Sequence, residues 1–242
     1  MNREYHRWFS PRLYRDMELL VFGHAGDRVV VFPTREGRFY DYENWGLVAA
    51  LEERIEQGRL QLFCVDSVDS EALYCRDCHP AARMARHKQY EGYILEEVVP
   101  LMLSHGPPAP LVAHGCSIGG YHAVNLAFRN PHLFQRVLAL SGRYDLTRPM
   151  GSFGDLFDGY YDADVYFHTP NHYIPNLSDP MILERLRRMK ITFIIGAQDP
   201  FYLSNWELSQ ALLSKGVSNQ LVVWAHEAHS ARYWRLMVRE HL

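Results

Sequence analysis

Three residues far apart in the chain are of the types that together perform nucleophilic catalysis: Ser117, Asp199 and His229. A serine hydroxyl is a weak nucleophile until a base removes its proton, and histidine commonly serves as that base. A carboxylate beside the histidine fixes its tautomer and stabilises the imidazolium that forms. The order serine, acid, histidine is one in which natural triads occur. We therefore predict that His229 is the base for Ser117 and that Asp199 is the orienting acid.

Ser117 lies in the pattern Gly115-Cys116-Ser117-Ile118-Gly119, which reads G-x-S-x-G. The apolar run before it, 109–114, predicts a buried strand, and the apolar run after it, 121–128, predicts a buried helix. Strand, sharp turn and helix form the context of a nucleophile elbow, in which the serine takes a strained backbone conformation. Glycine on both sides leaves room for the strand and the helix to approach closely. We expect Cys116 to point into the core.

The acid should follow a strand beyond the elbow. Asp199 follows the apolar run 191–196 and meets this requirement. Asp145 competes with it, because it follows another predicted strand, 135–140, and some hydrolases place their acid there. We favour Asp199.

The base should follow the last strand. Both His226 and His229 come after the run 220–224, and we favour His229, with His226 as a residue that stabilises the loop. His114 and His122 flank the elbow on either side. We expect these two histidines to be packed or hydrogen-bonded within the structure.

An oxyanion hole needs two N–H donors aimed at the developing negative charge. One is expected from Ile118, directly after the nucleophile. The other should come from the loop after the strand 28–33, which makes Thr34 or Arg35 the candidate; we favour Thr34. Asp66 ends a further strand, where it either lines the site or forms a turn.

Strand patterns alternate with helix patterns along most of the chain, which predicts an α/β fold with a mostly parallel sheet covered by helices on both faces. Residues 143–189 interrupt this rhythm and are rich in Gly, Pro, Asp and aromatic residues, so we expect a loop-rich insertion over the active site, after the sixth strand. We expect one domain, 1–242. The predicted strands are 3–10, 12–22, 28–33, 60–65, 109–114, 135–140, 191–196 and 220–224. Beside the elbow helix, the predicted helices are 44–57, 80–104, 179–189, 204–215 and 229–241. In the helix 80–104, Pro100 should cause a kink or mark the last turns.

Composition restricts the class of function. The chain has 242 residues, of which 48% are hydrophobic and 22% charged, and its net charge is −3. This charge disfavours general binding to nucleic acid or to anionic membranes. The N-terminal residues contain no apolar segment of a signal peptide, and no stretch of 18 apolar residues is present. We therefore expect a cytoplasmic location; the oligomeric state stays open.

The four cysteines are expected to be free thiols in a reducing compartment. Cys75 and Cys78 form a lone C-x-x-C. A zinc site would need two further ligands at suitable spacing, and His79 directly follows Cys78. A redox motif should lie at a helix N-terminus, and Pro80 does begin a predicted helix, so a thiol role stays as the alternative. We predict no metal and no cofactor.

Three stretches resemble a known family. Gly115 to Gly120 is similar to its nucleophile elbow, and Gly196-Ala197-Gln198-Asp199 resembles its acid loop. His229 to Arg235 is similar to the histidine, aromatic pair and arginine that open its last helix, and residues 83–100 resemble its long helix. The chain thus resembles the putative-esterase branch of the α/β-hydrolase superfamily, with S-formylglutathione hydrolases, feruloyl esterases and mycolyltransferases. In place of the H-G-G or H-G-x sequence that is common at the oxyanion loop, this chain has Phe32 to Gly37.

The resemblance implies the α/β-hydrolase fold and serine ester hydrolysis, and it names no substrate. We predict a serine carboxylesterase that acts on a small or medium acyl ester as its small-molecule partner. Acyl transfer by the same residues is one alternative, since an alcohol or thiol can replace water in deacylation. A binding protein that keeps the fold without turnover is another.

Overall fold

The strands at the centre of the fold are short apolar runs whose side chains alternate between two faces. In β3 (Asp27–Phe32), Val30 and Phe32 belong to one apolar cluster, whereas Val29 and Val31 belong to another. This alternation follows from the pleat of the strand. Both faces of the sheet are buried, as is typical of parallel strands covered by helices on both sides.

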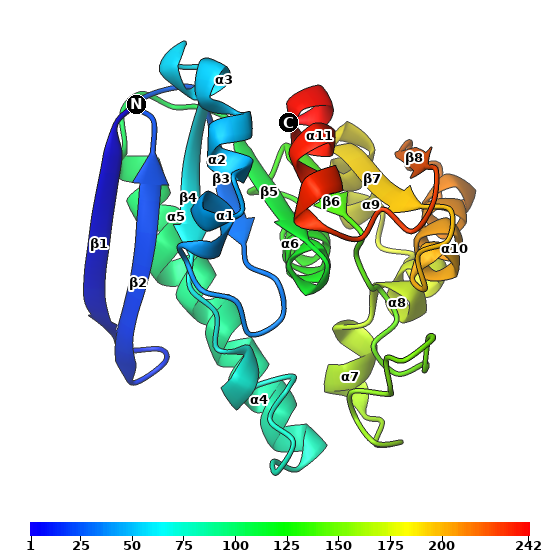
Figure 1. Cartoon of the computed structure of the whole chain (residues 1–242). Coiled ribbons are helices and arrows are strands. Elements are labelled where there is room, and N and C mark those ends of the chain that lie inside the picture. The colour runs from blue at the N-terminus through cyan, green and yellow to red at the C-terminus, as the bar shows by residue number, and fades with distance from the viewer.

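The structure, a computed structural model that describes residues 1–242, contains one sheet of eight strands (Figure 1). The strand order is β1-β2-β4-β3-β5-β6-β7-β8. The pairs β1–β2 and β2–β4 are antiparallel, and all the other neighbouring strands are parallel. The predicted α/β-hydrolase fold, with a mostly parallel sheet, is confirmed. The remaining strands are β1 (Arg3–Ser10), β2 (Arg15–Phe22), β4 (Leu60–Val65), β5 (Leu111–Cys116), β6 (Arg136–Leu140), β7 (Lys190–Gly196) and β8 (Gln220–Trp224).

Helices cover both faces of the sheet. Residues of α2, α3 and α11 belong to the same apolar cluster as Val29 and Val31, whereas α4, α5, α6 and α10 contribute to the cluster of Val30 and Phe32. The helices are α1 (Asp41–Asn44), α2 (Leu47–Ala50), α3 (Glu52–Glu56), α4 (Pro80–Tyr93), α5 (Val99–Ser104), α6 (Ile118–Arg129), α7 (Ala163–Phe167), α8 (Pro170–Asn176), α9 (Pro180–Arg188), α10 (Tyr202–Ser214) and α11 (Ala231–His241), with a 3-10 turn at Asp69–Glu71 and a π-helical turn at Ile94–Val98.

The prediction of a single helix over 44–57 is wrong, because this region forms the three short helices α1, α2 and α3. Gly46 has a φ of 74°, a left-handed conformation that cannot continue an α-helix. Leu51, between α2 and α3, has a φ of −108° and also departs from helical geometry. The predicted apolar face is nevertheless present, since the side chains of Leu47, Val48 and Ile55 are all buried.

The helix predicted over 80–104 is interrupted near the proline in it. The π-helical turn Ile94–Val98 separates α4 from α5, and Pro100 lies in the first turn of α5. A proline has no N–H to donate to the carbonyl four residues before it, and wider turns occur where the regular helical bonding is broken. The interruption therefore extends over five residues in place of a simple kink at Pro100.

The insertion 143–189 between β6 and β7 contains more helix than the sequence indicated, since α7 and α8 precede α9. Asp162 caps α7 by accepting a hydrogen bond from the backbone N–H of Val165, and Pro170 occupies the first turn of α8. Figure 1 shows α7 and α8 at the same end of the molecule as α4, where Lys88 of α4 pairs with Asp164 of α7.

The expectation of four free thiols is wrong for two of them. Cys75 and Cys78 form a disulfide, whereas Cys64 and Cys116 are free and buried. Cys116 contributes to the apolar cluster of Val29 and Val31, and so points into the core as predicted. The helices of the structure are too short or too polar to cross a bilayer.

Candidate active site

The turn between β5 and α6 has the strain that the sequence pattern predicts. Ser117 has φ 57° and ψ −125°, a backbone conformation that non-glycine residues rarely adopt. Its N–H donates to the carbonyl of Leu140 on β6 at 2.8 Å, and its carbonyl accepts from the N–H groups of Gly120 and Tyr121. These bonds hold the strained residue at the end of β5 and the start of α6.

The glycines on both sides of Ser117 are required by close backbone contacts. A Cβ added to Gly115 would lie 2.3 Å from the carbonyl carbon of Gly119. A Cβ added to Gly119 would lie 2.4 Å from the carbonyl oxygen of Phe32, at the end of β3. Strand β5, helix α6 and the end of β3 thus meet without room for side chains, as the elbow interpretation predicts.

The structure brings the three predicted residues into one chain of hydrogen bonds. His229 Nε2 lies 3.1 Å from Ser117 Oγ, and His229 Nδ1 lies 2.8 Å from Asp199 Oδ2. The Asp199 side chain is fully buried, whereas 15% of the His229 side chain is exposed. The other Asp199 oxygen accepts a hydrogen bond from the N–H of Phe201 at 2.9 Å. With Asp199 ionised, Nδ1 carries the proton and Nε2 is free to accept the one from Ser117.

The loop that carries His229 is held against the loop that carries Asp199. The N–H of Gln198 donates to the carbonyl of His226 at 2.9 Å. A Cβ added to Gly196 would lie 1.8 Å from the carbonyl oxygen of Glu227, so only glycine permits this approach. The side chain of His226 is exposed and makes no hydrogen bond. His226 therefore stabilises the loop through its backbone carbonyl alone.

Two aromatic side chains fix the plane of the His229 ring. The Phe201 ring lies 5.7 Å from it and the Trp234 ring 5.4 Å, both edge-on. Trp234 is itself anchored by a hydrogen bond from its Nε1 to Ser141 Oγ at 3.1 Å. Phe201 is a site residue that no motif indicates; its position two residues after Asp199 is the only sequence signal for it.

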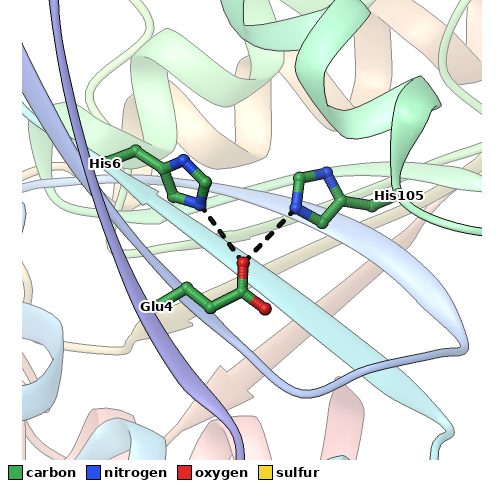
Figure 2. A group of neighbouring side chains, drawn as sticks. All are labelled: Glu4, His6 and His105. Carbon is green, nitrogen blue, oxygen red and sulfur yellow. Dashed lines mark hydrogen bonds and ion pairs between the residues drawn. The ribbon is translucent and has the colours of Figure 1, made fainter.

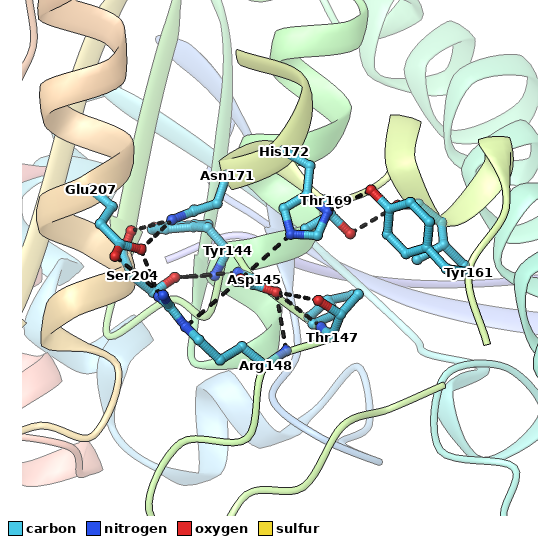
Figure 3. A network of polar contacts seen from close by, with 12 residues as sticks. Tyr144, Asp145, Thr147, Arg148, Tyr161, Thr169, Asn171, His172, Ser204 and Glu207 are labelled. Atoms are coloured by element: carbon cyan, nitrogen blue, oxygen red, sulfur yellow. Dashed lines mark hydrogen bonds and ion pairs between the residues drawn. The ribbon is translucent and has the colours of Figure 1, made fainter. Parts of the chain in front are cut away.

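The competing acid, Asp145, does not contact His229. Its Oδ1 accepts hydrogen bonds from Thr147 and from the N–H of Arg148, and its Oδ2 faces His172 Nε2 at 3.5 Å (Figure 3). Burial raises the pKa of the Asp145 carboxyl, but hydrogen bonds from His172 and Thr147 outweigh this effect and lower the pKa below its ordinary value. Asp145 therefore organises the start of the insertion.

The remaining polar residues near the elbow have structural partners. His114 is buried between the hydroxyl of Tyr42 and the carbonyl of Leu138, and His122 is buried beside Asp69, as expected for packed histidines. Asp66 accepts hydrogen bonds from Arg38 Nε and from the N–H of Phe39, which makes it a buried loop-forming residue.

The two predicted oxyanion donors belong to segments that meet at the elbow. Ile118 is the first residue of α6, and the N–H groups of a first helical turn lack partners within the helix. Thr34 lies two residues beyond Phe32, whose carbonyl abuts Gly119. The carbonyl of Thr34 accepts a hydrogen bond from the N–H of Gly37 at 2.8 Å, which closes a tight turn after β3.

One buried cluster of histidine and glutamate, made by His87, Glu91 and His168, has the composition of a metal site. The guanidinium of Arg129 contacts both Glu91 and His168, so a cation already occupies that position. This cluster is a hydrogen-bonded part of the core.

Comparisons with known proteins identify the family and the fold. A family model described as Esterase, putative esterase, matches residues 36–235, most of the chain. No curated protein matches the chain in sequence. Among solved structures, a ferulic acid esterase is similar, with a TM-score of 0.77 and 17% identity over 100% of this chain and 96% of the other.

Two further solved structures show the same fold. S-formylglutathione hydrolase from Staphylococcus aureus gives a TM-score of 0.70 at 18% identity and covers 99% of this chain and 94% of its own. MPT51 from Mycobacterium tuberculosis gives 0.71 at 13% identity, over 99% and 96%. The family match spans the elbow and both loops that carry Asp199 and His229. The chain belongs to the putative esterase family of the α/β-hydrolase superfamily, and it is a carboxylic ester hydrolase.

Proposed function

We propose that the protein hydrolyses small or medium acyl esters through an acyl-enzyme formed on Ser117. The observation that carries this proposal is the continuous chain of hydrogen bonds from Ser117 Oγ through His229 to Asp199, at 3.1 Å and 2.8 Å. Each of these distances is within reach of proton transfer between a nucleophile and its base. The proposal includes the cytoplasmic location predicted from the sequence.

In the first half of the reaction, Ser117 Oγ attacks the ester carbonyl while His229 Nε2 takes the hydroxyl proton. Asp199 stabilises the resulting imidazolium and keeps the ring oriented. The N–H groups of Ile118 and Thr34 stabilise the negative charge on the carbonyl oxygen. The imidazolium then gives its proton to the departing alcohol, which leaves the acyl group on Ser117.

In the second half, His229 takes a proton from a water molecule, which attacks the acyl-enzyme. The tetrahedral intermediate collapses, Ser117 regains its proton from His229, and the free acid leaves. Aromatic residues of the insertion 143–189 form one wall of the site in this proposal. This part of the proposal is supported by the packing of the Phe153 ring on the Phe201 ring, whose centroids are 4.7 Å apart, since the Phe201 ring packs in turn against His229.

The proposal is tested by fluorophosphonate labelling of the purified protein, with peptide mass mapping and with p-nitrophenyl acetate, butyrate and octanoate as substrates. We expect labelling at Ser117 and turnover that depends on acyl length, both abolished in Ser117→Ala. Ser104→Ala, an exposed serine at the end of α5, is the matched control and should behave as the unmodified protein. Labelling at another residue, or turnover retained in Ser117→Ala, contradicts the proposal.

Hydrolysis and acyl transfer are distinguished by product analysis in the presence of a competing alcohol. A hydrolase releases mostly free acid, whereas a transferase releases mostly the new ester. We expect free acid as the main product at alcohol concentrations up to the millimolar range.

A further inference from the structure

A cleft of about 430 Å³ lies beside the loop that follows β3. This volume is in the range of small-molecule binding sites. Four arginines and two aspartates contribute to its lining: Arg35, Arg76, Arg83, Arg143, Asp155 and Asp158. The cleft therefore has a formal charge of +2, although the whole chain has a net charge of −3.

Two residues that line the cleft, Leu73 and Phe153, connect it with the proposed reaction centre through side-chain packing. Leu73 lines the cleft and belongs to the same small apolar cluster as Ile118, the residue next to Ser117. Phe153, on the opposite segment, also lines the cleft and contacts the Phe201 ring, which packs against His229. A substrate bound at Ser117 can thus extend into this cleft.

Arg143 is a buried cation without a carboxylate partner. Only 2% of the residue is exposed, and its Nε and Nη2 donate to four backbone carbonyls, two of them those of Asp145 and Gly154. Its Nη1 makes no hydrogen bond within the protein, yet this atom is not enclosed. Burial lowers the pKa of the Arg143 guanidinium from its ordinary value. A buried cation held in this way favours an anion from outside the protein.

Arg35 and Arg76 add positive charge that the protein does not neutralise. Both side chains are exposed and neither makes an ion pair, while Arg35 lies over the Tyr74 ring at 5.7 Å. The charge of Arg83, by contrast, is matched by Asp158 at 2.9 Å. Arg35 also directly follows Thr34, the proposed oxyanion donor, so its guanidinium belongs to the segment nearest the reacting carbonyl.

We propose that this cleft binds an anionic group of the substrate, a carboxylate or a phosphate, with Arg35 and Arg143 as its main partners. A guanidinium presents parallel N–H donors that match both groups. The inference rests on the proposed function and narrows its substrate class from any small ester to esters that carry a negative charge.

The experiment compares pairs of substrates that differ in charge and hardly in size. Mono-p-nitrophenyl glutarate is paired with p-nitrophenyl pentanoate, and 4-acetoxybenzoate with phenyl acetate, each rate being divided by the rate with hydroxide. One charge-assisted hydrogen bond corresponds to a preference of about 10–100-fold. We expect a kcat/KM preference of this size for the charged member of at least one pair, decreasing as salt is added.

Arg35→Gln should remove most of this preference, because it lowers kcat/KM for the charged member of a pair far more than for the neutral member. Arg185→Gln, an exposed arginine on α9 without an ion pair, is the matched control and should retain the preference. Equal rates within both pairs overturn the inference. So does an Arg35→Gln variant that loses charged and neutral substrates to the same extent, because Arg35 would then act on the reaction in general.

Failure of the proposed function looks different, since neither charged nor neutral esters would then react. In that case, calorimetry with glutarate and with inorganic phosphate on the Ser117→Ala protein tests the cleft directly. Binding of either anion that Arg35→Gln weakens supports the inference, and no binding of either anion overturns it. The two arms also distinguish a carboxylate from a phosphate.

A second inference rests on a separate group of residues, Glu4 and His6 of β1 and His105 after α5 (Figure 2). Residues 4 and 6 of a strand project from the same face. Oε2 of Glu4 lies 3.3 Å from His6 Nε2 and 3.6 Å from His105 Nε2. Figure 2 shows both rings directed at this one oxygen.

The hydrogen bonds of His105 leave a lone pair aimed at a carboxylate. His105 Nδ1 donates to the carbonyl of Leu101 at 2.8 Å, so the neutral ring has no proton on Nε2. The other Glu4 oxygen accepts a hydrogen bond from Asn2 at 2.8 Å, which leaves Oε2 for the two rings. The lone pair on His105 Nε2 and the negatively charged Oε2 of Glu4 repel each other, and a cation bound between them would remove this repulsion.

We infer that these three residues bind a divalent transition-metal ion of the zinc type. Zinc takes tetrahedral ligands at 2.0–2.2 Å, which places neighbouring ligand atoms about 3.3–3.6 Å apart. The two distances from Glu4 Oε2 to the histidine nitrogens, 3.3 and 3.6 Å, match this spacing. A second hydrogen bond to the far nitrogen of a ligand histidine, as His105 makes with Leu101, is typical of metal sites. The ion would tie the edge strand β1 to the end of α5.

Calorimetric titration of the full chain with ZnCl2 tests this inference, together with melting temperatures and the rate of ester hydrolysis. We expect one zinc ion per chain and a higher melting temperature, with unchanged turnover. His6→Ala and His105→Ala should each weaken binding by ~10-fold or more. His132→Ala, which removes an exposed histidine elsewhere, should bind zinc normally. No binding, or binding that neither variant weakens, overturns the inference.

Discussion

Two histidine–carboxylate pairs lie on opposite sides of the elbow, and only one of them is placed to do chemistry. His229 and Asp199 are 2.8 Å apart, and the second nitrogen of His229 faces Ser117. His122 and Asp69 are 3.1 Å apart, and both are almost completely buried. The residue types and the contact are therefore the same in the two pairs.

The difference lies in what surrounds the histidine ring. His122 lies within α6, and the rings of Phe32, Tyr90 and Tyr121 pack around it. His229 lies in a loop, keeps part of its surface exposed and has a strained serine as its neighbour. A histidine–carboxylate pair can therefore catalyse a reaction only where a substrate can reach the histidine and a nucleophile lies beside it. The four predictions that follow test this comparison.

The largest expected effect is the loss of turnover in Ser117→Ala and His229→Ala. Removing either member of a cooperating triad lowers kcat on the order of 10⁶-fold. Ser117→Ala should keep the melting temperature of the unmodified protein, whereas His229→Ala leaves the buried Asp199 carboxylate without its partner and should lower the melting temperature as well. His122→Ala should affect stability alone: it leaves the Asp69 carboxylate buried without its partner and lowers the free energy of unfolding by about 3 kcal/mol, while the folded fraction turns over normally. Turnover of p-nitrophenyl butyrate and thermal unfolding measure the two effects.

The second prediction compares the two carboxylates. Asp199→Asn should lower kcat by about 10⁴-fold, because the amide can donate to Nδ1 and so favours the wrong tautomer of His229. Asp69→Asn should cost about 1–3 kcal/mol of stability, with little change in kcat. If Asp69→Asn reduces kcat as strongly as Asp199→Asn in fully folded protein, the distinction between the two pairs fails.

The third prediction concerns the backbone contacts that hold Ser117 in its strained conformation. In Gly119→Ala, the new methyl group meets the carbonyl oxygens of Phe32 and Pro33, at 2.4 and 2.5 Å. We expect a loss of about 1–3 kcal/mol in stability together with reduced turnover, since the elbow must shift. A Cβ at Gly154 meets no atom within 4 Å, so Gly154→Ala should keep its melting temperature. Equal melting temperatures for the two variants contradict this explanation.

The fourth prediction concerns the pH dependence of stability, through a third histidine. Burial lowers the pKa of His114 to about 4, because desolvation disfavours the charged form of the enclosed ring, and the hydrogen bond to the carbonyl of Leu138 offsets only part of this effect. The unfolded chain binds this proton near the ordinary histidine value of about 6.5, so stability is full above that pH and decreases as the pH falls towards 4. His114→Gln should flatten this part of the curve of unfolding free energy against pH. A curve as steep as that of the unmodified protein assigns the effect to other groups.

Local patterns in the sequence were enough for the fold class and for much of the elbow. The β-branched run in β3 and the apolar runs around Ser117 predicted strands and a helix that the structure contains. They were not enough where local geometry departs from periodicity. Gly46 breaks an otherwise regular helical pattern. In the insertion, Asp162, which caps α7, and Pro170, in the first turn of α8, stand among residues that are typical of turns. The pairing of Cys75 with Cys78 was also missed, since spacing alone does not determine the redox state of a thiol.

By itself, the sequence determined the order of the strands, the strained turn at Ser117 and the positions of Asp199 and His229 in two loops after strands. These are local properties, set by periodicity, glycine positions and the ends of elements. Only the tertiary structure decided that Asp199 rather than Asp145 contacts His229, and that four arginines from separate segments meet in one cleft. Contacts between residues distant in the chain depend on how the elements pack, and the packing of whole elements is not encoded in any one stretch of residues.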